Sequence, residues 1–166
     1  MEKKTILVVD NGETIRETLL KILEREGYNV LTAEDGQAAL EVMRDQKINV
    51  IISDVCMPRM DGIKLLKIAK SILPDVEIIL MTGHGKMEMG LEALKEGAFD
   101  FIQKPFTKLA LNKTVKQALE KQAMAAEMRF LKGRVRELIA EIMDLVGEPA
   151  VHRLEYSRTL GVNSPH

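Results

Sequence analysis

The chain has 166 residues, of which 46% are hydrophobic and 30% charged, and its formal net charge is −1 at pH 7. This length fits one domain plus an extension, and the balanced charge gives no broad attraction to nucleic acid or to an anionic membrane. A single cysteine excludes an intrachain disulfide, and the apolar run Ile6–Val9 is too short for a signal peptide or a membrane span. We expect a cytoplasmic protein with no membrane segment and no direct binding of nucleic acid.

Short apolar runs alternate with longer amphipathic stretches as far as about residue 120. The first run is rich in β-branched residues without polar alternation, which indicates a strand buried on both faces. On this basis strands are predicted at 6–9, 28–32, 50–52, 76–81 and 99–102. Apolar side chains at helical spacing predict helices at 14–26, 35–46, 63–71, 87–96 and from about 107. Five strands, each followed by a helix, imply parallel pairing and an open, doubly wound α/β sheet with helices on both faces.

Polar side chains stand where four of these strands end, at Asp10, Asn11, Asp54, Thr82 and Lys104. Each alone is more simply explained as a helix cap, a turn or a solvated loop. Their joint placement favours a site, because ligands of such sheets bind beyond the carboxyl ends of the strands. Two carboxylates can hold a hard divalent cation, and a carboxylate can be a nucleophile that forms an acyl phosphate. A metal, an ammonium group and a hydroxyl can share the phosphoryl oxygens.

The segment Asp54–Gly62, which reads DVCMPRMDG, resembles the phosphoacceptor segment of response-regulator receiver domains. Val8–Asp10, Met81–Gly85 and Lys104–Phe106 stand where that family carries its other motifs. The resemblance covers roughly residues 4–120 and is strongest to receivers attached to sigma-54-dependent transcription activators. It implies a flavodoxin-like fold, in which a five-stranded parallel sheet has the order 2-1-3-4-5.

The resemblance also implies roles for individual residues. Asp54 would accept the phosphoryl group, with Lys104 pairing to it through a loop in which the bond to Pro105 is commonly cis. Thr82 would be the switch hydroxyl that moves towards the phosphoryl group, and Phe101 the aromatic switch residue that then turns inward. The change would reach the face formed by the fourth helix, the fifth strand and the fifth helix.

The implied metal is Mg²⁺, held by Asp10, Asn11, Asp54 and the backbone carbonyl of Cys56. The sequence departs from the family here, because Asn11 stands where a second metal-binding aspartate is usual. An amide oxygen can coordinate a cation but brings no charge. We therefore expect weaker Mg²⁺ binding and slower phosphorylation.

Three functions remain open on these residues. The first is a response regulator of a two-component phosphorelay that takes its phosphoryl group from a sensor histidine kinase. Such a protein assists its own phosphorylation and dephosphorylation but turns over no external substrate. The second, motivated by Asn11, is a degenerate receiver that acts as a phosphorylation-independent interaction module. The third is a metal-dependent phosphohydrolase on a similar sheet, which would need metal-binding acids in more places than the sequence offers.

Beyond residue 120 the apolar pattern changes to alternating steps of three and four, at Met128, Leu131, Val135, Leu138, Ile142 and Leu145. This is the a and d pattern of a coiled coil, and its order favours two parallel strands. We expect a receiver domain at 1–120, an amphipathic helix able to form a coiled coil at 121–147, and a short helix and tail at 148–166. A homodimer through the helix is one expectation, and a helix lying back on its own receiver is the alternative.

Overall fold

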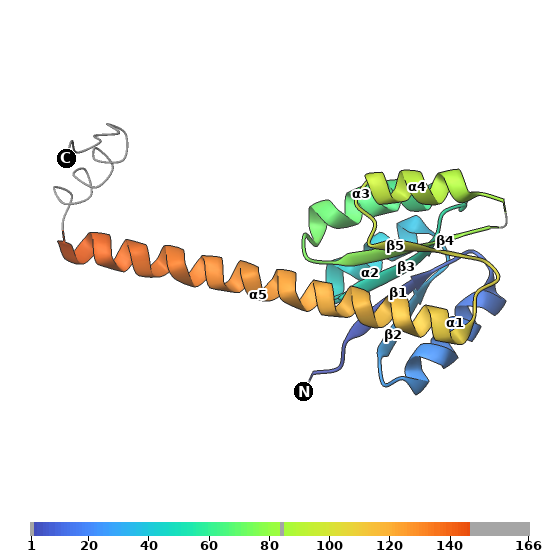
Figure 1. The fold of residues 1–166 in the computed structure, drawn as a ribbon, viewed down its shortest axis with the longest axis horizontal. Helices are drawn as coiled ribbons and strands as arrows, with labels where there is room; N and C mark the ends of the chain where they lie inside the picture. The colour runs from blue at the N-terminus through green and yellow to red at the C-terminus, as the bar shows by residue number, and fades with distance from the viewer. Residues whose placement is uncertain (1, 84, 147–166) are drawn as a thin grey trace, which may run out of the picture. The chain divides into compact units, whose positions relative to one another are not determined.

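The computed structural model describes residues 2–83 and 85–146, and the description below concerns these (Figure 1). The strands are β1 Thr5–Val9, β2 Asn29–Ala33, β3 Val50–Asp54, β4 Glu77–Thr82 and β5 Asp100–Gln103. The helices are α1 Glu13–Arg25, α2 Gly36–Asp45, α3 Gly62–Ile72, α4 Met87–Lys95 and α5 Lys108–Val146. Each of the five strands and five helices predicted up to about residue 107 is present, and their predicted ends lie within two residues of the observed ones.

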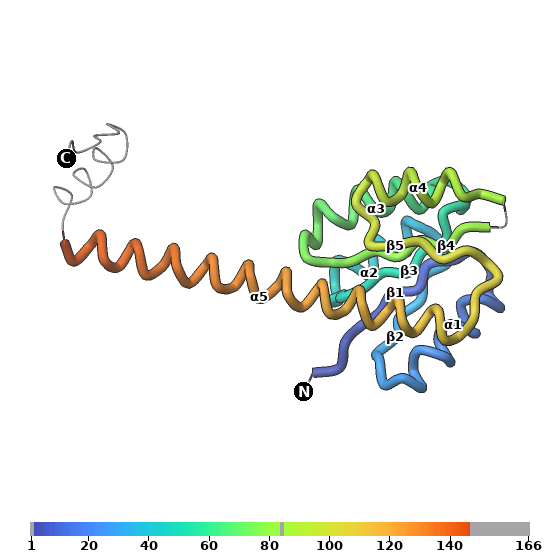
Figure 2. The backbone as a smooth tube through the Cα atoms, in the orientation of Figure 1, coloured from blue at the N-terminus to red at the C-terminus, as the bar shows by residue number. Residues whose placement is uncertain are grey.

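All strand pairs are parallel, and the sheet has the order β2-β1-β3-β4-β5. The predicted flavodoxin-like fold is therefore confirmed. Figure 2 traces the chain as it leaves each strand, passes through a helix and returns to the sheet. Because every strand runs the same way, the carboxyl ends of β1, β3, β4 and β5 meet at one edge, which is where the polar residues singled out above stand.

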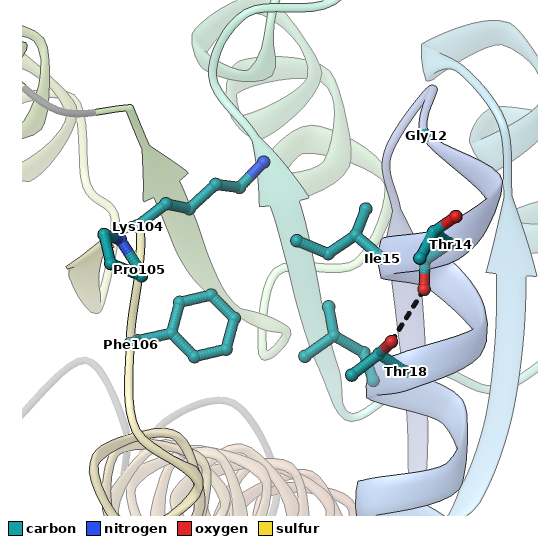
Figure 3. A pocket seen from close by; sticks show the side chains of 8 residues that line it. Gly12, Thr14, Ile15, Thr18, Lys104, Pro105 and Phe106 are labelled. Atoms are coloured by element: carbon teal, nitrogen blue, oxygen red, sulfur yellow. Dashed lines mark hydrogen bonds between the residues drawn. The ribbon is translucent and has the colours of Figure 1, made fainter.

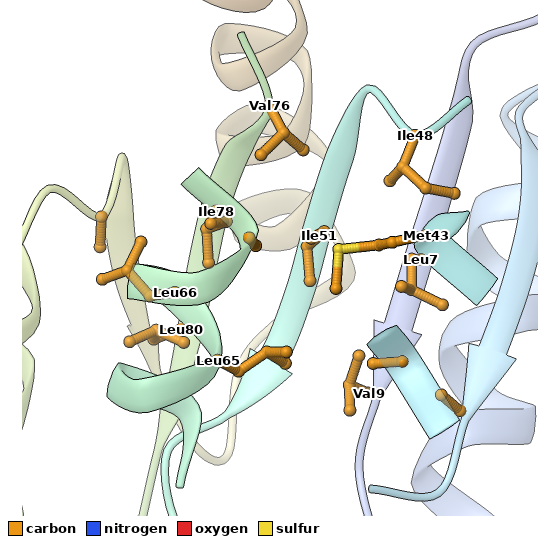
Figure 4. Close-up of a cluster of buried hydrophobic side chains, with 14 of the residues drawn as sticks. Leu7, Val9, Met43, Ile48, Ile51, Leu65, Leu66, Val76, Ile78 and Leu80 are labelled. Carbon is orange, nitrogen blue, oxygen red and sulfur yellow. The ribbon is translucent and has the colours of Figure 1, made fainter. Parts of the chain in front are cut away.

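Both faces of the sheet are covered, since successive side chains of a strand point to opposite faces. On β1, Leu7 and Val9 pack beneath α2, α3 and α4, whereas Ile6 and Val8 pack beneath α1 and α5. Figure 4 shows the first of these layers, in which Leu65 and Leu66 of α3 lie against strand residues. The apolar runs of β1, β3 and β4 lack alternation because neither face of these strands meets water.

The chain divides into two compact units, Met1–Ala125 and Ala126–His166. The boundary predicted at residue 120 falls inside α5, which is continuous from Lys108 to Val146. The described part of the second unit is the end of this helix, whose apolar seam residues are all exposed. The predicted short helix and tail at 148–166 lie outside the described residues. The predicted partition of the chain stays a prediction.

A buried polar contact ties α5 to the amino edge of the sheet. The Asn49 side chain, just before β3, donates from Nδ2 to Oε1 of Gln122 at 3.2 Å and accepts from the Thr5 backbone N–H at 2.9 Å. Both Asn49 and Gln122 are buried. A buried amide is stable only when such partners are present, so this pair fixes which face of α5 meets β3.

An ion-pair cluster lies at the same edge. Glu77, at the start of β4, is only 3% exposed. Its carboxylate lies 3.6 Å from Nζ of Lys70 and 3.5 Å from Nζ of Lys121, and the Lys121 ammonium also lies 5.6 Å from the centre of the Phe99 ring. A buried carboxylate needs compensating charge of this kind, and α5 supplies part of it through Lys121.

We expect Gln122→Ala to lower the free energy of unfolding by about 1–3 kcal/mol, because it leaves a buried Asn49 N–H without its partner. The matched control is Gln117→Ala, at an exposed position of the same helix, which should change stability by less than about 0.5 kcal/mol. Urea unfolding measures both. An equal effect of the two substitutions would show that the Asn49 contact contributes nothing.

Candidate functional site

Three charged side chains meet at the carboxyl edge of the sheet. Asp10 follows β1, Asp54 ends β3, and Lys104 follows β5. The Lys104 ammonium donates to Oδ2 of Asp10 at 3.0 Å and to Oδ2 of Asp54 at 3.1 Å. The convergence that the sequence predicts for these three residues is therefore present, and the two carboxylates lie within reach of one cation.

Backbone N–H groups orient the two carboxylates. Oδ1 of Asp10 accepts from the Gly12 N–H at 2.8 Å, and Oδ1 of Asp54 accepts from the Cys56 N–H at 3.1 Å. Each carboxylate thus uses one oxygen to hold its own loop and turns the other towards Lys104. This division aims the second oxygen of each acid at the same ammonium group.

Lys104 is the electrostatic centre of the cluster. Burial lowers the pKa of its ammonium group, whereas the hydrogen bonds and charges of Asp10 and Asp54 raise it. The raising effect is the larger, so the pKa lies above the usual 10.5. The lysine is therefore cationic at neutral pH. It offsets the repulsion between two carboxylates held close together, and it leaves the trio with a net negative charge that favours a further cation.

The oxygen donors at this edge fit Mg²⁺. Asp10 and Asp54 supply carboxylates, and oxygen ligands of this type are those that Mg²⁺ takes. Asn11 is exposed at the start of the loop that leads into α1. Among residues 2–83 and 85–146, no three acid, histidine or cysteine side chains gather in a metal-binding group. Of the residues that the sequence assigns to the metal, the structure brings Asp10 and Asp54 together around Lys104.

The hydroxyl of Thr82 is buried beside this cluster. Thr82 ends β4, is 1% exposed, and its Oγ1 has no hydrogen-bond partner among the described residues. Its backbone carbonyl accepts from the Lys104 N–H at 2.7 Å, which joins β4 to the loop after β5. A buried hydroxyl without a partner is uncommon in folded proteins, and this one is available to an acceptor that enters the site.

Phe101 lies on β5, which β4 separates from the strand that ends in Asp54. It is half-buried, pairs with Leu80 across the β4–β5 ladder, and packs against the core beneath α3 and α4. The structure therefore places Phe101 two residues along the ladder from the Thr82–Gln103 pair. The site and α4 are connected through this part of the sheet.

Two residues that the sequence did not single out shape the acid loops. A Cβ on Gly62 would lie 2.4 Å from the backbone oxygen of Asp54, so only glycine lets α3 begin this close to the end of β3. Arg16 donates from Nη1 to the Asp10 carbonyl at 2.7 Å and holds the loop before α1. The Asp61-Gly62 pair was a usable signal for the first; nothing local in the sequence marks the second.

A cavity of about 680 Å³ opens next to Lys104. Figure 3 shows Lys104 and Phe106 on one side of it, facing Ile15 and Thr18 of α1 on the other. The Lys104–Pro105 bond in its wall is cis, as the family resemblance implies. The full lining is Gly12, Thr14, Ile15, Thr18, Leu19, Lys104, Pro105 and Phe106. It provides an apolar surface beside the acids.

This arrangement defines a class of protein. A parallel, doubly wound sheet that presents two carboxylates, a lysine and a free hydroxyl at its carboxyl edge is suited to accepting a phosphoryl group on an aspartate. Residues 6–116 match the family model of the response regulator receiver domain, and the chain belongs to this family. Receiver domains are phosphoacceptors of two-component systems, phosphorylated by histidine kinases, and typically bind Mg²⁺.

Regulatory proteins are among the similar sequences. The chain is 33% identical over 151 residues to the C4-dicarboxylate transport transcriptional regulatory protein DctD of Rhizobium meliloti, covering 90% of this chain and 33% of DctD. It is 39% identical over 126 residues to the regulatory protein AtoC of Escherichia coli, covering 76% and 27%. It thus spans about a third or less of these two relatives. With FixJ of Bradyrhizobium diazoefficiens it shares 33% over 140 residues, covering 84% and 68%.

Solved receiver structures agree with this assignment. The receiver domain of NtrX from Brucella abortus superimposes with a TM-score of 0.67 at 36% identity, covering 69% of this chain and 98% of that one. A receiver domain protein from Clostridium thermocellum gives a TM-score of 0.70 at 33% identity, covering 74% and 98%. Relatives such as DctD, NtrX and NtrC bear out the resemblance to receivers of sigma-54-dependent activators. In the described part of the chain, no helix is long and apolar enough to cross a membrane.

Proposed function

We propose that this receiver takes its phosphoryl group on Asp54 from a sensor histidine kinase and acts as the switch of a two-component phosphorelay. The observation that carries the assignment is the difference between the two acids. The Asp54 side chain is 14% exposed and that of Asp10 is 3% exposed, although both contact Lys104. Only Asp54 combines contact with the lysine and access for a donor.

In the proposed step a carboxylate oxygen of Asp54 attacks the phosphorus, so that an O–P bond forms as the N–P bond to the donor histidine breaks. The Lys104 ammonium neutralises one phosphoryl oxygen, and the Thr82 hydroxyl donates to another. Asp10, Asp54, the Cys56 carbonyl and Asn11 would hold Mg²⁺, which when bound would supply further positive charge to the site. The same groups would assist hydrolysis of the acyl phosphate.

We expect acetyl phosphate with Mg²⁺ to add one phosphoryl mass to the wild type and none to Asp54→Asn, since the amide is a poor nucleophile. Intact-mass spectrometry measures both. Thr82→Ala is the matched control, because its lost hydroxyl is not the nucleophile, and it should still be labelled. Labelling that persists in Asp54→Asn would remove Asp54 from the role.

We also propose that Asn11 weakens the metal site. At an effective dielectric constant near 20, two unit charges about 4 Å apart interact by roughly 4 kcal/mol, and a divalent ion doubles this gross figure. Desolvation of the added carboxylate offsets a large part of the gain. The remaining difference favours the usual aspartate, so the present site should bind Mg²⁺ more weakly and be labelled more slowly.

Accordingly, Asn11→Asp should tighten Mg²⁺ binding, measured by titration, and speed labelling by acetyl phosphate. Asn29→Asp makes the same charge change at an exposed position at the start of β2, at the amino edge of the sheet. It should alter neither Mg²⁺ affinity nor the labelling rate. Unchanged or weaker affinity in Asn11→Asp would refute the proposal. A wild type that is never labelled, beside an Asn11→Asp variant that is, would favour the second candidate function, an interaction module that works without phosphorylation.

The proposed output is the face formed by α4, β5 and α5. When the Thr82 hydroxyl turns to the phosphoryl group it leaves space next to β5, and Phe101 moves into that space. The support is the Oγ1 of Thr82, which has no hydrogen-bond partner among the described residues, and the half-buried ring of Phe101 on the adjacent strand. A switch requires contacts that differ between its two states, and the Thr82 hydroxyl and the Phe101 ring are the groups proposed to differ.

We propose that residues 121–146 join two copies of the chain. The seam residues from Met128 to Leu145 are all about half exposed or more, and burying each apolar side chain is worth roughly 1.5–3 kcal/mol before ordering costs. Charge favours a parallel pair, in which Glu127 at g faces Lys132 at e of the second copy. An antiparallel pair centred on Arg134 would instead oppose like charges, Arg134 to itself and Glu127 to Glu141.

Leu138→Lys should therefore convert a dimer to a monomer, because it places a charge in the middle of the seam. Phe130→Lys is the matched control, since Phe130 is an exposed apolar residue of the same helix that lies off the seam, and it should remain dimeric. Light scattering at micromolar concentration decides between them. A monomeric wild type would refute the dimer and favour the alternative, packing of the helix on its own receiver.

A further inference from the structure

Gly90 in the middle of α4 lies directly beneath the Phe101 ring. A Cβ built on Gly90 would be 2.6 Å from Cδ2 of the ring and 2.7 Å from both Cε2 and Cγ. Real Cβ atoms are essentially never closer than 3.0 Å to another heavy atom. Three ring atoms at nearly equal distance mean that the ring lies flat on the Gly90 backbone, in space that any other residue would fill.

The backbone itself does not call for glycine at this position. Gly90 is not among the residues with positive φ, and it is enclosed in the regular helix Met87–Lys95. Glycine in a helix interior is destabilising relative to alanine. The contact with Phe101 is therefore the structural feature that explains a buried glycine here.

We propose that Gly90 is a positioning residue of the switch. Because Gly90 has no side chain, it leaves a space, here called the seat, that the Phe101 ring occupies when Lys104 pairs directly with Asp54. This inference rests on the proposed role of Phe101. Residue 90 then sets the balance between the two ring positions, because any side chain larger than hydrogen excludes the ring from the seat.

The seat also connects the ring to the output face. The side chains of Met87, Leu91 and Leu94 surround this part of α4 and are exposed. A ring that leaves Gly90 removes packing from beneath the helix that carries them. The position of α4 thus depends on the ring directly.

The contact is tested first by a double-mutant cycle that needs no phosphorylation. Gly→Ala in a helix with free space should raise the folding equilibrium constant about two- to fivefold. Gly133→Ala is the matched control, because nothing lies within 4 Å of a Cβ at that position, and it should show this gain. Gly90→Ala should show no gain, or a loss, in the wild type and should recover the gain in a Phe101→Ala background. Equal gains in both backgrounds would overturn the contact.

The switch role is tested by ¹⁹F NMR on protein made with 4-fluorophenylalanine at its four phenylalanines. The Phe101 signal is assigned by its loss in Phe101→Leu. In Gly90→Ala without any phosphodonor, that signal should already lie where the wild type moves on adding acetyl phosphate and Mg²⁺. Gly133→Ala should keep the wild-type position. A Phe101 signal in Gly90→Ala that stays at the wild-type position, or moves to a third one, would overturn the proposal.

The two failures can be told apart. If the wild type gains phosphoryl mass but its Phe101 signal does not move, the proposed switch is wrong, whatever Gly90→Ala does. If the wild-type signal moves but that of Gly90→Ala does not, the switch stands and the seat is wrong.

Discussion

The Lys104 ammonium between two carboxylates is the interaction on which the site depends. Asp10 and Asp54 follow neighbouring strands and would repel each other without a cation between them. Lys104 reaches both from the far side of β4, so its charge closes a cluster built from three strands. A phosphoryl group or a metal ion that enters must compete for the same oxygens, and this makes the loops around the cluster sensitive to occupancy.

The rest of the sheet supports this cluster because its packed strands resist movement. The strands β1, β3 and β4 are buried on both faces and pack against helices at close-packed density. None of these three strands can shift without disturbing two layers of side chains. Change is therefore confined to groups with free space or missing partners. Among the described residues, the unpaired hydroxyl of Thr82 and the half-buried ring of Phe101 are of this kind. The physical character of the two proposed switch residues follows from the rigidity around them.

The sequence predicted the sheet and the placement of its polar residues because both rest on local patterns. The run Ile6–Val9 and the strand-end position of Asp54 are legible without tertiary knowledge. The contact at Gly90 could not be predicted from the sequence, because it depends on the ring of Phe101, which is eleven residues later in the chain and belongs to a different element. The Asn49–Gln122 contact spans 73 residues and has no sequence signature. Asn11 was visible as a departure, but its effect on metal affinity is a question of energies that neither pattern nor geometry decides.

The polar contacts at the amino edge have a consequence for how strain is distributed. Asn49 and Glu77 hold the starts of β3 and β4 to α5 at the edge opposite the acids. The strands are thereby clamped at one end, so local opening should be graded along their length. Amide hydrogens near Asn49 should exchange only with global unfolding, whereas those at the Asp54 end should exchange through smaller openings. The receiver thus has a rigid amino edge, held to α5, and a carboxyl edge around the acids that opens more readily.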